Sequence, residues 1–233
     1  MTWALVPVKD LSKSKQRLGS VLGPGEREGL MLAMVRDVLT AISAATSIQG
    51  ILLVSRSPQI RVVAHQFGAE LFEESGGADL SCAMTEASSY LLERHAAGSA
   101  LIIPGDVPLV RSGDIENLLA RDASVVLVPD LDDKGSNAIF TTPPSAITFH
   151  YGPGSFGRHV SAARAAGFEP AIVRDQRIGL DIDELRDLLR LPGEHPGSHT
   201  EAFLKDSDIV LRLNNMSSGQ TLESVRSQTG TGA

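Results

Sequence analysis

The chain has 233 residues, of which 42% are hydrophobic, and 28 acidic residues outnumber 21 basic ones. This length suffices for one large α/β domain, and a net charge of −7 argues against a broad nucleic-acid-binding surface. The single cysteine, Cys82, excludes an intramolecular disulfide framework, and we find neither a signal peptide nor an apolar run long enough to span a membrane, so we expect a cytoplasmic protein without a membrane partner.

Short β-rich runs alternate with helix-like windows along the chain. The expected strands are 2–8, 50–55, 69–74, 99–104, 124–129, 137–142 and 169–174. The expected helices are 24–45, 59–67, 80–97, 113–121, 155–166 and 184–190. Most of the strands are continuously apolar, which is typical of strands covered on both faces. The order therefore predicts an α/β fold with a mainly parallel sheet between helical layers, whose ligands bind beyond the carboxyl ends of the strands.

The C-terminal part gives weaker signals. We expect a single domain over residues 1–213 and a flexible tail over 214–233, where the composition is polar. Just before this tail lies an apolar patch of Ile209, Val210, Leu211 and Leu213. The patch is expected to dock either on its own domain or on a neighbouring copy.

A basic stretch, VPVKDLSKSKQRLG (6–19), follows the first strand and contains Lys9, Lys13, Lys15 and Arg17. In a loop at the ligand edge of the sheet, Lys15 and Arg17 can hold the phosphates of a nucleotide through charge-assisted hydrogen bonds. The alternative is a basic loop that is merely solvated. Neither a P-loop motif nor a strand followed by G-x-G-x-x-G is present, so the common phosphate cradles are not supported.

Three aspartates are candidate metal ligands. Asp106 follows the buried strand of ALIIPGDVPLV (100–110), and Asp181 and Asp183 flank Ile182 in IGLDIDEL (178–185). Residues i and i+2 of an extended segment point to one face, so both carboxylates can converge on a cation. Hard oxygen ligands favour Mg²⁺ over zinc. The alternatives are a turn organised by Asp106 and a helix N-cap at Asp183.

Glycines and a serine stand before the helix expected at 155–166. In HYGPGSFGRHV (150–160), Ser155 fits an N-cap, and exposed backbone N–H groups at this point would make a cradle for a phosphate or a carboxylate. A plain capped helix is the alternative. His159 is expected on a helix face and not as a metal ligand.

Taken in order, VPVKDLSKSKQRLG, LGPGEREGLMLAMVRDVL, IIPGDVPLV, GSNAIF, HYGPGSFGRH and LDID resemble the 2-phospho-L-lactate guanylyltransferase family of deazaflavin coenzyme F(420) biosynthesis. The resemblance implies a three-layer, Rossmann-like α/β/α nucleotidyltransferase fold of the molybdopterin-guanylyltransferase type. It also implies transfer of GMP from GTP, as co-substrate, to the phosphate of a three-carbon acid, with release of pyrophosphate. A downstream transferase of the pathway and a homodimer are partners that the resemblance leaves open.

The resemblance also assigns roles to residues. Asp106, Asp181 and Asp183 match metal-binding carboxylates. Those that match contacts to the phospho-acid are Asn137, Gly152 and Ser155. Lys9, Lys15 and Arg17 match the basic loop, whose role toward the GTP phosphates we infer from charge.

Two departures from the family pattern concern helix starts. Leu80-Ser81-Cys82-Ala83 replaces the usual Leu-Asn-x-Ala, and Glu184-Leu185 follows Asp183 where the family tends to have Thr-Pro. If Ser81 and Cys82 form a pocket wall, the enlarged pocket slightly favours 3-phospho-D-glycerate over 2-phospho-L-lactate and phosphoenolpyruvate. Alternatively, Ser81 caps the helix and Cys82 packs in the core.

Two other functions are compatible with the same strand-end carboxylates. One is a nucleotide-sugar glycosyltransferase, which would not need the Lys-x-Arg loop. The other is a nucleotide-binding module without turnover, in which Asp106 and Asp181 would be dispensable.

Overall fold

The computed structural model describes residues 1–9, 11, 14–75 and 79–213. Within these residues a seven-stranded sheet has the order β3-β2-β1-β4-β6-β5-β7. The strands are β1 (Thr2–Pro7), β2 (Ile48–Val54), β3 (Glu70–Phe72), β4 (Ser99–Ile102), β5 (Val125–Pro129), β6 (Ser136–Thr141) and β7 (Ala171–Ile172). Only β6 runs antiparallel to its neighbours, β4 and β5, and the remaining pairs in the described sheet are parallel. The predicted mainly parallel sheet is confirmed.

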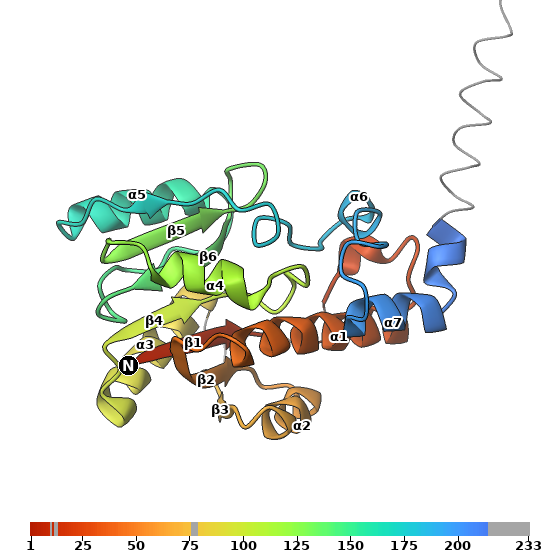
Figure 1. Ribbon diagram of the computed structural model, residues 1–233, viewed down its shortest axis with the longest axis horizontal. Helices are drawn as coiled ribbons and strands as arrows, with labels where there is room; N and C mark the ends of the chain where they lie inside the picture. Colours follow the sequence, from red (N-terminus) through yellow and green to blue (C-terminus); the bar gives the residue numbers. More distant parts are fainter. Residues whose placement is uncertain (10, 12–13, 76–78, 214–233) are drawn as a thin grey trace, which may run out of the picture.

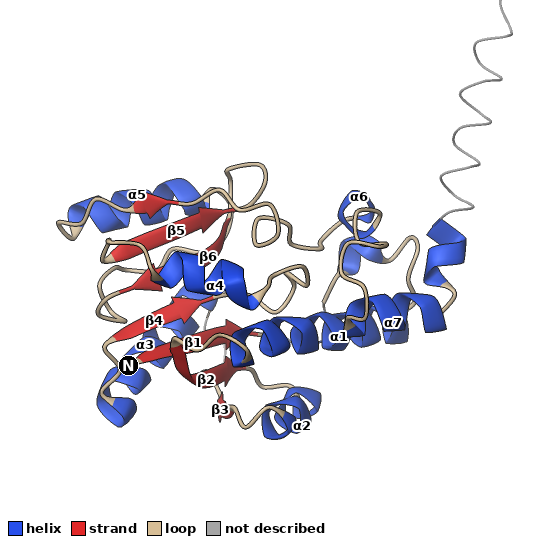
Figure 2. Ribbon diagram, in the orientation of Figure 1, coloured by secondary structure: helices blue, strands red, loops and turns tan. Residues whose placement is uncertain are grey.

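Helices cover both faces of this sheet (Figure 2). They are α1 (Pro24–Ser43), α2 (Pro58–Gln66), α3 (Leu80–His95), α4 (Ser112–Leu119), α5 (Ser155–Ala165), α6 (Leu185–Leu188) and α7 (His199–Asp206), with a short 3-10 helix η2 (Gln16–Leu18). One core lies between the sheet and α1, α2 and α4, and the other between the sheet and α3 and α5. The three layers predicted from the alternation of strands and helices are confirmed.

The apolar strands fill both cores because successive side chains point to opposite faces of a sheet. Leu5 and Leu52, which pair across β1 and β2, belong to the core under α3 and α5. Their neighbours Val6 and Leu53 belong to the core under α1. The arrows of β1, β4 and β5 all point toward the side of the molecule where α6 lies (Figure 1). That edge is where ligands of such sheets bind.

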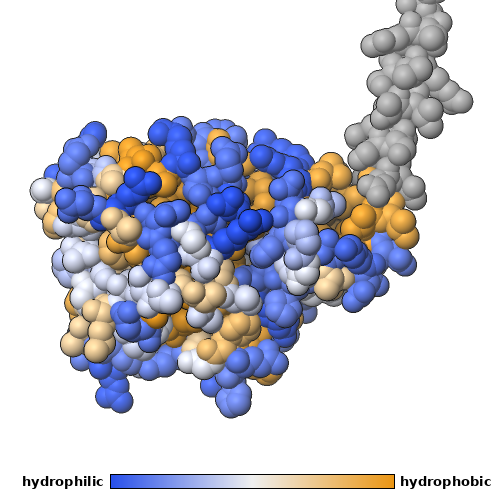
Figure 3. Space-filling model, viewed as in Figure 1, coloured by the Kyte–Doolittle hydropathy of each residue, from blue (hydrophilic) through white to orange (hydrophobic). Residues whose placement is uncertain are grey.

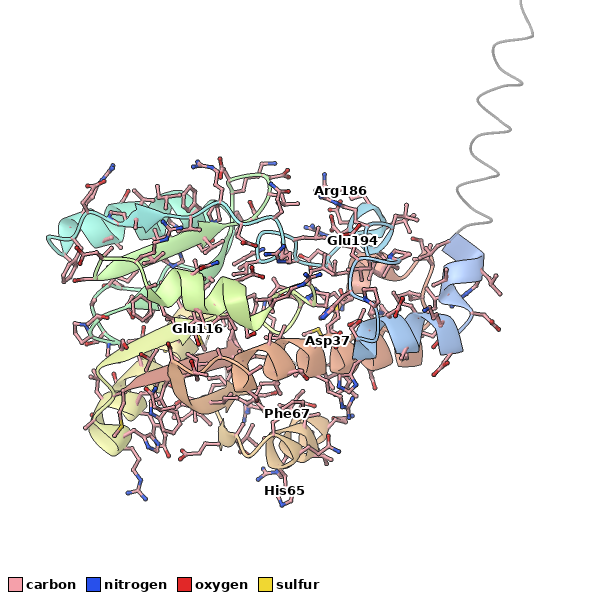
Figure 4. All side chains as sticks on the ribbon, in the orientation of Figure 1. Asp37, His65, Phe67, Glu116, Arg186 and Glu194 are labelled. Atoms are coloured by element: carbon pink, nitrogen blue, oxygen red, sulfur yellow. The ribbon has the colours of Figure 1, made fainter. Side chains whose placement is uncertain are left out.

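The segment after α6 contains a helix that the sequence did not predict, α7, which packs on α1. Asp37 of α1, labelled in Figure 4, accepts hydrogen bonds from the backbone N–H groups of His199 (2.7 Å) and Thr200 (2.9 Å) and so caps α7 from outside. Ser198 caps the same helix through a bond from Glu201 N (3.0 Å). Asp37 is buried, so this cap joins the C-terminal segment firmly to α1.

The apolar patch at 209–213 docks on its own domain. Ile209 and Leu213 are buried in the core under α1, whereas Leu211 is 61% exposed, at the end of the described chain where Figure 3 shows hydrophobic surface. The tail expected at 214–233 lies outside the described residues. None of the described helices has the length and apolar composition that crossing a membrane requires.

Candidate active site

Lys15, Asp106 and Asp183 meet at the carboxyl end of the sheet. The Lys15 ammonium donates to Asp106 Oδ2 at 2.6 Å and to Asp183 Oδ1 at 2.7 Å. The three residues come from the loop after β1, the loop after β4 and the segment before α6. The strand-end geometry thus brings together residues that are far apart in sequence, as expected.

Lys15 is a buried cation with an unusual backbone conformation. Its side chain is only 4% exposed and its backbone has a left-handed φ of 53°, which is uncommon for a residue other than glycine. Burial alone would lower the pKa of the ammonium, but the charges and hydrogen bonds of Asp106 and Asp183 outweigh it, and the pKa is raised. Lys15 is therefore a fixed, buried positive charge between two carboxylates.

Asp181 lies in a different electrostatic setting. Burial and the nearby charge of Asp106 raise the pKa of Asp181 from 3.8 to about 6, although Asn137 Nδ2 donates to its Oδ1 at 3.1 Å. No cationic side chain among the described residues pairs with Asp181. The negative charge of Asp106 and Asp181 is thus incompletely balanced on this side, and a bound cation would relieve it.

The predicted three-aspartate magnesium site stays a prediction. Among the described residues, no group of three or more His, Cys, Asp or Glu side chains is arranged to hold a metal ion, because Asp106 and Asp183 both turn toward Lys15. The donor set nevertheless fits Mg²⁺, since Asp106 and Asp181 offer hard oxygen ligands and repel each other. The alternative of Asp183 as a helix N-cap is wrong, because Glu184 occupies that position before α6.

Asn137 is a positioning group for the aspartate segment. It is 7% exposed, and its Nδ2 donates to the backbone carbonyls of Ile178 and Gly179, at 3.0 Å each, besides Asp181. The predicted contact of Asn137 with a phospho-acid stays a prediction. These bonds show that its amide already fixes the backbone that precedes Asp181.

The glycine loop before α5 is tied to the start of β6. Ser155 Oγ accepts from Ser136 N at 3.1 Å, and the N-cap of α5 is Gly154, not Ser155 as predicted. Ser155 is 3% exposed, and Gly152 has a left-handed φ of 102°. The loop is therefore preorganised next to Asn137, and its role toward an anion stays a prediction.

Fully buried His159 supports the same loop. Its Nε2 accepts from His150 N at 2.9 Å, so Nδ1 carries the hydrogen and donates to Ser136 Oγ at 2.9 Å. Burial, with lesser effects of His150 and Arg158, lowers the pKa of His159 to about 4. The imidazole therefore stays neutral at physiological pH, as these two bonds require.

Ser81 does not cap α3, and Cys82 does not pack in the core. Ser81 Oγ accepts from Tyr151 N at 2.9 Å and so joins α3 to the glycine loop, while Asp79 is the N-cap of α3. Cys82 is exposed, not packed in the core. Leu80, the residue before them, lines the cavity beside Lys15, and a role of Ser81 and Cys82 as a wall of the acid pocket stays a prediction.

Two cavities flank the Lys15 cluster. The lysine cavity has a volume of about 460 Å³, and its lining residues are Pro7, Lys9, Ser14, Lys15, Met31, Leu80, Pro104, Gly105, Asp106 and Asp183. The arginine cavity has a volume of about 540 Å³, and its lining residues are Arg17, Asp130, Leu131, Asp132, Lys134, Gly179, Leu180, Asp181, Asp183, Glu184, Arg186, Asp187 and Arg190. Asp183 lines both, so the two cavities meet at this residue. This arrangement can hold two ligands with their reacting groups side by side.

The basic loop is divided between these cavities. Lys9 is exposed and lines the lysine cavity, whereas Arg17 lines the arginine cavity and donates to Glu184 Oε1 at 3.0 Å. The Arg17 side chain is 70% exposed, so this pair is weak and can open toward a ligand. Lys13 lies outside the described residues.

Sequence reasoning missed the anchor of the aspartate segment. Arg177 donates to Asp114 through Nε at 2.7 Å and through Nη2, and Arg111 N donates to the same carboxylate at 3.0 Å. The Asp114 hydrogen bonds, more than its charge alone, raise the pKa of Arg177. Asp114 is 4% exposed, so α4 holds residues 175–179 through a buried carboxylate. No motif marks this pair, because its members are 63 residues apart.

Comparisons with known proteins agree with this geometry. A family model described as "Guanylyl transferase CofC like" matches residues 2–226. The phosphoenolpyruvate guanylyltransferase of Rubrobacter xylanophilus is 37% identical over 81% of this chain and 92% of its own length. The 2-phospho-L-lactate guanylyltransferase of Methanothermobacter thermautotrophicus is 31% identical over 88% of this chain and 90% of its own.

Solved structures show the same fold at lower identity. A putative nucleotide-diphospho-sugar transferase from Desulfovibrio desulfuricans G20 superposes with a TM-score of 0.74 at 19% identity, covering 91% of this chain and 96% of that one. A nucleotidyl transferase from Methanothermobacter thermautotrophicus gives a TM-score of 0.62 at 13% identity, covering 88% and 99%. With the family model spanning nearly the whole chain and both curated relatives covered almost end to end, this chain belongs to the CofC-like guanylyltransferase family and is a nucleotidyltransferase.

Proposed function

We propose that this enzyme transfers GMP from GTP to the phosphate of a three-carbon phospho-acid, giving a GDP-linked acid and pyrophosphate for coenzyme F(420) biosynthesis. The observation that carries the proposal is the meeting of the lysine and arginine cavities at Asp183, beside Lys15, Asp106 and Asp181. A transfer between two bound substrates needs two such compartments with one shared boundary. The names of the relatives support the guanylyl group and the class of acceptor.

In the proposed reaction, a phosphate oxygen of the acid attacks the α-phosphorus of GTP. A new P–O–P bond forms as the bond to the pyrophosphate oxygen breaks, and pyrophosphate takes the electron pair. The phosphate of the acid is already ionised at neutral pH, so no general base is required. The main barrier for the enzyme to lower is repulsion between the anions.

The side chains at the boundary supply the opposite charge. We place the triphosphate in the lysine cavity, where Lys9 is exposed and the Lys15 ammonium remains protonated because its pKa is raised. Arg17 lines the arginine cavity and can exchange Glu184 for a phosphate oxygen, because their pair is exposed to solvent. Asp106 and Asp181, with Asp183, would hold Mg²⁺, which supplies Lewis-acid stabilisation of the phosphoryl oxygens when bound.

The phospho-acid belongs on the side of Asn137, Gly152 and Ser155. Asn137 is bonded to Asp181 of the arginine cavity, and Phe156 N donates to Lys134 O of its wall at 3.1 Å. Phosphoenolpyruvate is the acid to test first, because several relatives carry its name. The preference for 3-phospho-D-glycerate inferred from Ser81 and Cys82 stays a prediction; Ser81 bonds to the glycine loop next to Gly152, and Cys82 is exposed.

The test is to incubate the protein with GTP, Mg²⁺ and each of the three acids, and to follow pyrophosphate release and the mass of the product. One acid should give a GDP-linked product in step with pyrophosphate. A glycosyltransferase would instead consume a nucleotide sugar and release a nucleoside diphosphate, and a binding module would release nothing.

A further inference from the structure

A third cavity lies farther along the same sheet edge, beyond the ends of β2 and β3. This Glu74 cavity has a volume of about 430 Å³, and its lining residues are Leu11, Glu28, Arg56, Ser57, Pro58, Gln59 and Glu74. Its size is within the range of small-molecule sites, roughly 300–1,000 Å³. None of the residues that we assign above to phosphate or Mg²⁺ binding lines this cavity.

Glu74 has an unpaired carboxylate between two residues that contact α2 and α3. Its neighbour Glu73 pairs with Arg61 of α2, and Ser75 N donates to Glu86 Oε2 of α3 at 3.2 Å. The Glu74 carboxylate itself has no hydrogen bond or ion pair with any described residue, although it is half-buried. A half-buried carboxylate without a partner that lines a cavity is an available hydrogen-bond acceptor.

Hydrogen-bond donors come from the neighbouring strand end. Arg56 lies two residues after the end of β2 and forms no ion pair with any described residue. Ser57 Oγ donates to Gln59 Oε1 at 2.7 Å, which leaves the Nε2 donors of Gln59 unused. Ser55 N donates to Phe72 O at 3.1 Å and holds the ends of β2 and β3 together. Acceptor and donors therefore follow the ends of adjacent strands, and such strands lie about 5 Å apart.

The Glu74 cavity and the lysine cavity border the ends of neighbouring strands at the same edge of the sheet. In the sheet order β3-β2-β1-β4, the ends of β1 and β4 border the lysine cavity, and those of β2 and β3 border the Glu74 cavity. Leu11, which lines the Glu74 cavity, lies in the chain between Lys9 and Lys15 of the lysine cavity. Three strand spacings amount to about 14 Å, a span comparable to an extended nucleoside triphosphate.

We propose that the Glu74 cavity binds the guanine base and that Glu74 is its specificity-determining residue; this inference rests on the proposed use of GTP. Guanine carries two donors side by side, N1–H and the N2 amino group, which together match one carboxylate. Its O6 and N7 acceptors match Arg56 or the Gln59 amide, as in the pairing of Arg with guanine in nucleic acids. Adenine presents an unprotonated N1 and would meet the Glu74 carboxylate with a repulsive lone pair.

The experiment compares GTP, ATP and XTP with the wild type and Glu74→Gln, measured both by equilibrium binding and by kcat/KM for pyrophosphate release with phosphoenolpyruvate. Xanthine has a carbonyl oxygen at C2, which a carboxylate repels and an amide N–H can bond. Glu74→Gln should lower kcat/KM for GTP by about 30-fold and raise it for XTP by about tenfold. Glu28→Gln is the matched control, because it removes the same charge from the same cavity, and it should leave the GTP:XTP ratio unchanged.

The outcomes separate this inference from the proposed function. If wild-type protein uses GTP but Glu74→Gln leaves the GTP:XTP ratio unchanged, or Glu28→Gln shifts it instead, the assignment of Glu74 is overturned and the function stands. If GTP binds with the predicted preference but no acid is guanylylated, the base site is supported and the function fails. A wild-type protein that prefers another triphosphate overturns both.

Discussion

The charges of two of the site aspartates have opposite effects on the stability of the fold. Asp106 compensates the buried ammonium of Lys15, whereas Asp181 has no cationic partner among the described residues and its pKa is raised to about 6. Removing the charge of one should therefore change the stability of the fold in the opposite direction to removing the charge of the other.

Asp106→Asn leaves Lys15 with Asp183 as its remaining carboxylate partner. We expect the free energy of unfolding at pH 7 to fall by on the order of 1–3 kcal/mol and the chemical step to slow by on the order of 100-fold. Denaturant titration and single-turnover kinetics measure the two effects. Asp122→Asn is the control, because Asp122 is exposed, lines neither of the two cavities and forms no ion pair with any described residue. Turnover at the wild-type rate in folded Asp106→Asn protein would remove Asp106 from the mechanism.

Asp181→Asn should stabilise the fold without metal. The folded pKa of Asp181, about 6, lies above the unfolded value of 3.8, so the native state binds a proton more readily, and ionised Asp181 destabilises the fold above pH 6. In a chelating buffer the variant should therefore melt a few degrees higher than wild type at pH 8, and the difference should vanish as pH falls toward 4. A lower Tm at pH 8, or a difference independent of pH, would contradict the assignment of charge.

The types of the site residues could be predicted from sequence, but not their pairing. Strand ends and acidic spacing identified Asp106, Asp181 and Asp183, because a parallel sheet gathers such positions at one edge. The burial of Lys15 between two of them depends on the left-handed backbone of Lys15 itself, which no local sequence pattern predicts. Likewise, the alternative that Cys82 packs in the core followed from average propensity, yet its helix presents it to solvent.

Among the elements, the segment from Asp175 to Asp183 is the one on which the site depends most. Arg177 joins it to α4, Asn137 to β6, and Ile182 N to the carbonyl of Asp106 at 3.0 Å. These attachments fix the distance between the aspartates on two different loops. Loosening one of them should affect alignment more than binding.

Arg177→Gln removes the attachment to α4. We expect kcat to fall by about tenfold with smaller changes in KM for either substrate, since both cavities persist. Arg174→Gln is the control, because Arg174, immediately before this segment, forms an exposed ion pair with Asp133. Steady-state kinetics of both variants, with Tm measured alongside, decide the matter. Equal effects of the two substitutions would show that the buried pair has no positioning role.

The docking of α7 on α1 can be tested at two glycines of α1. A Cβ on Gly29 would lie 2.5 Å from the ring of Phe203 in α7, whereas one on Gly25 meets nothing within 4 Å. Gly25→Ala should leave stability unchanged or raise it by up to about 1 kcal/mol, because alanine favours the helix. Gly29→Ala should instead lower stability by about 1–3 kcal/mol. Thermal denaturation compares them, and the same sign for both would contradict the close packing of Phe203.

The sequence predicted all seven strands in the described chain and missed α7. Continuous apolar runs mark buried strands clearly, whereas α7 is short and follows a stretch rich in Gly, Pro and His. Its N-terminal signal was present nonetheless, since Ser198 and Glu201 form the S-x-x-E pattern. Glu201 N donates to Ser198 Oγ, whereas Glu201 Oε2 accepts from Gly197 N, one residue before the N-cap. For α7, the partner Asp37 could not be identified from sequence, because the cap comes from another helix.

At the scale of the whole molecule, the fold places three cavities along one edge of the sheet among the described residues. We interpret them as sites for the base, the triphosphate and the phospho-acid, in that order from β3 toward β6. In this interpretation, the aspartates lie between the triphosphate and the acid. The resemblance of ordered motifs indicated the family, whereas the succession of cavities required the structure.

The measurement that tests guanylyl transfer most directly follows the oxygen atoms. Phosphoenolpyruvate labelled with ¹⁸O in its phosphate is incubated with GTP, Mg²⁺ and enzyme. The mass of the product is then measured by mass spectrometry. Attack by the acid's phosphate on the α-phosphorus predicts a GDP-linked acid that retains every labelled oxygen, formed in equal amount with unlabelled pyrophosphate. Release of unlinked GMP, or of labelled inorganic phosphate in place of a linked product, would contradict the proposed reaction.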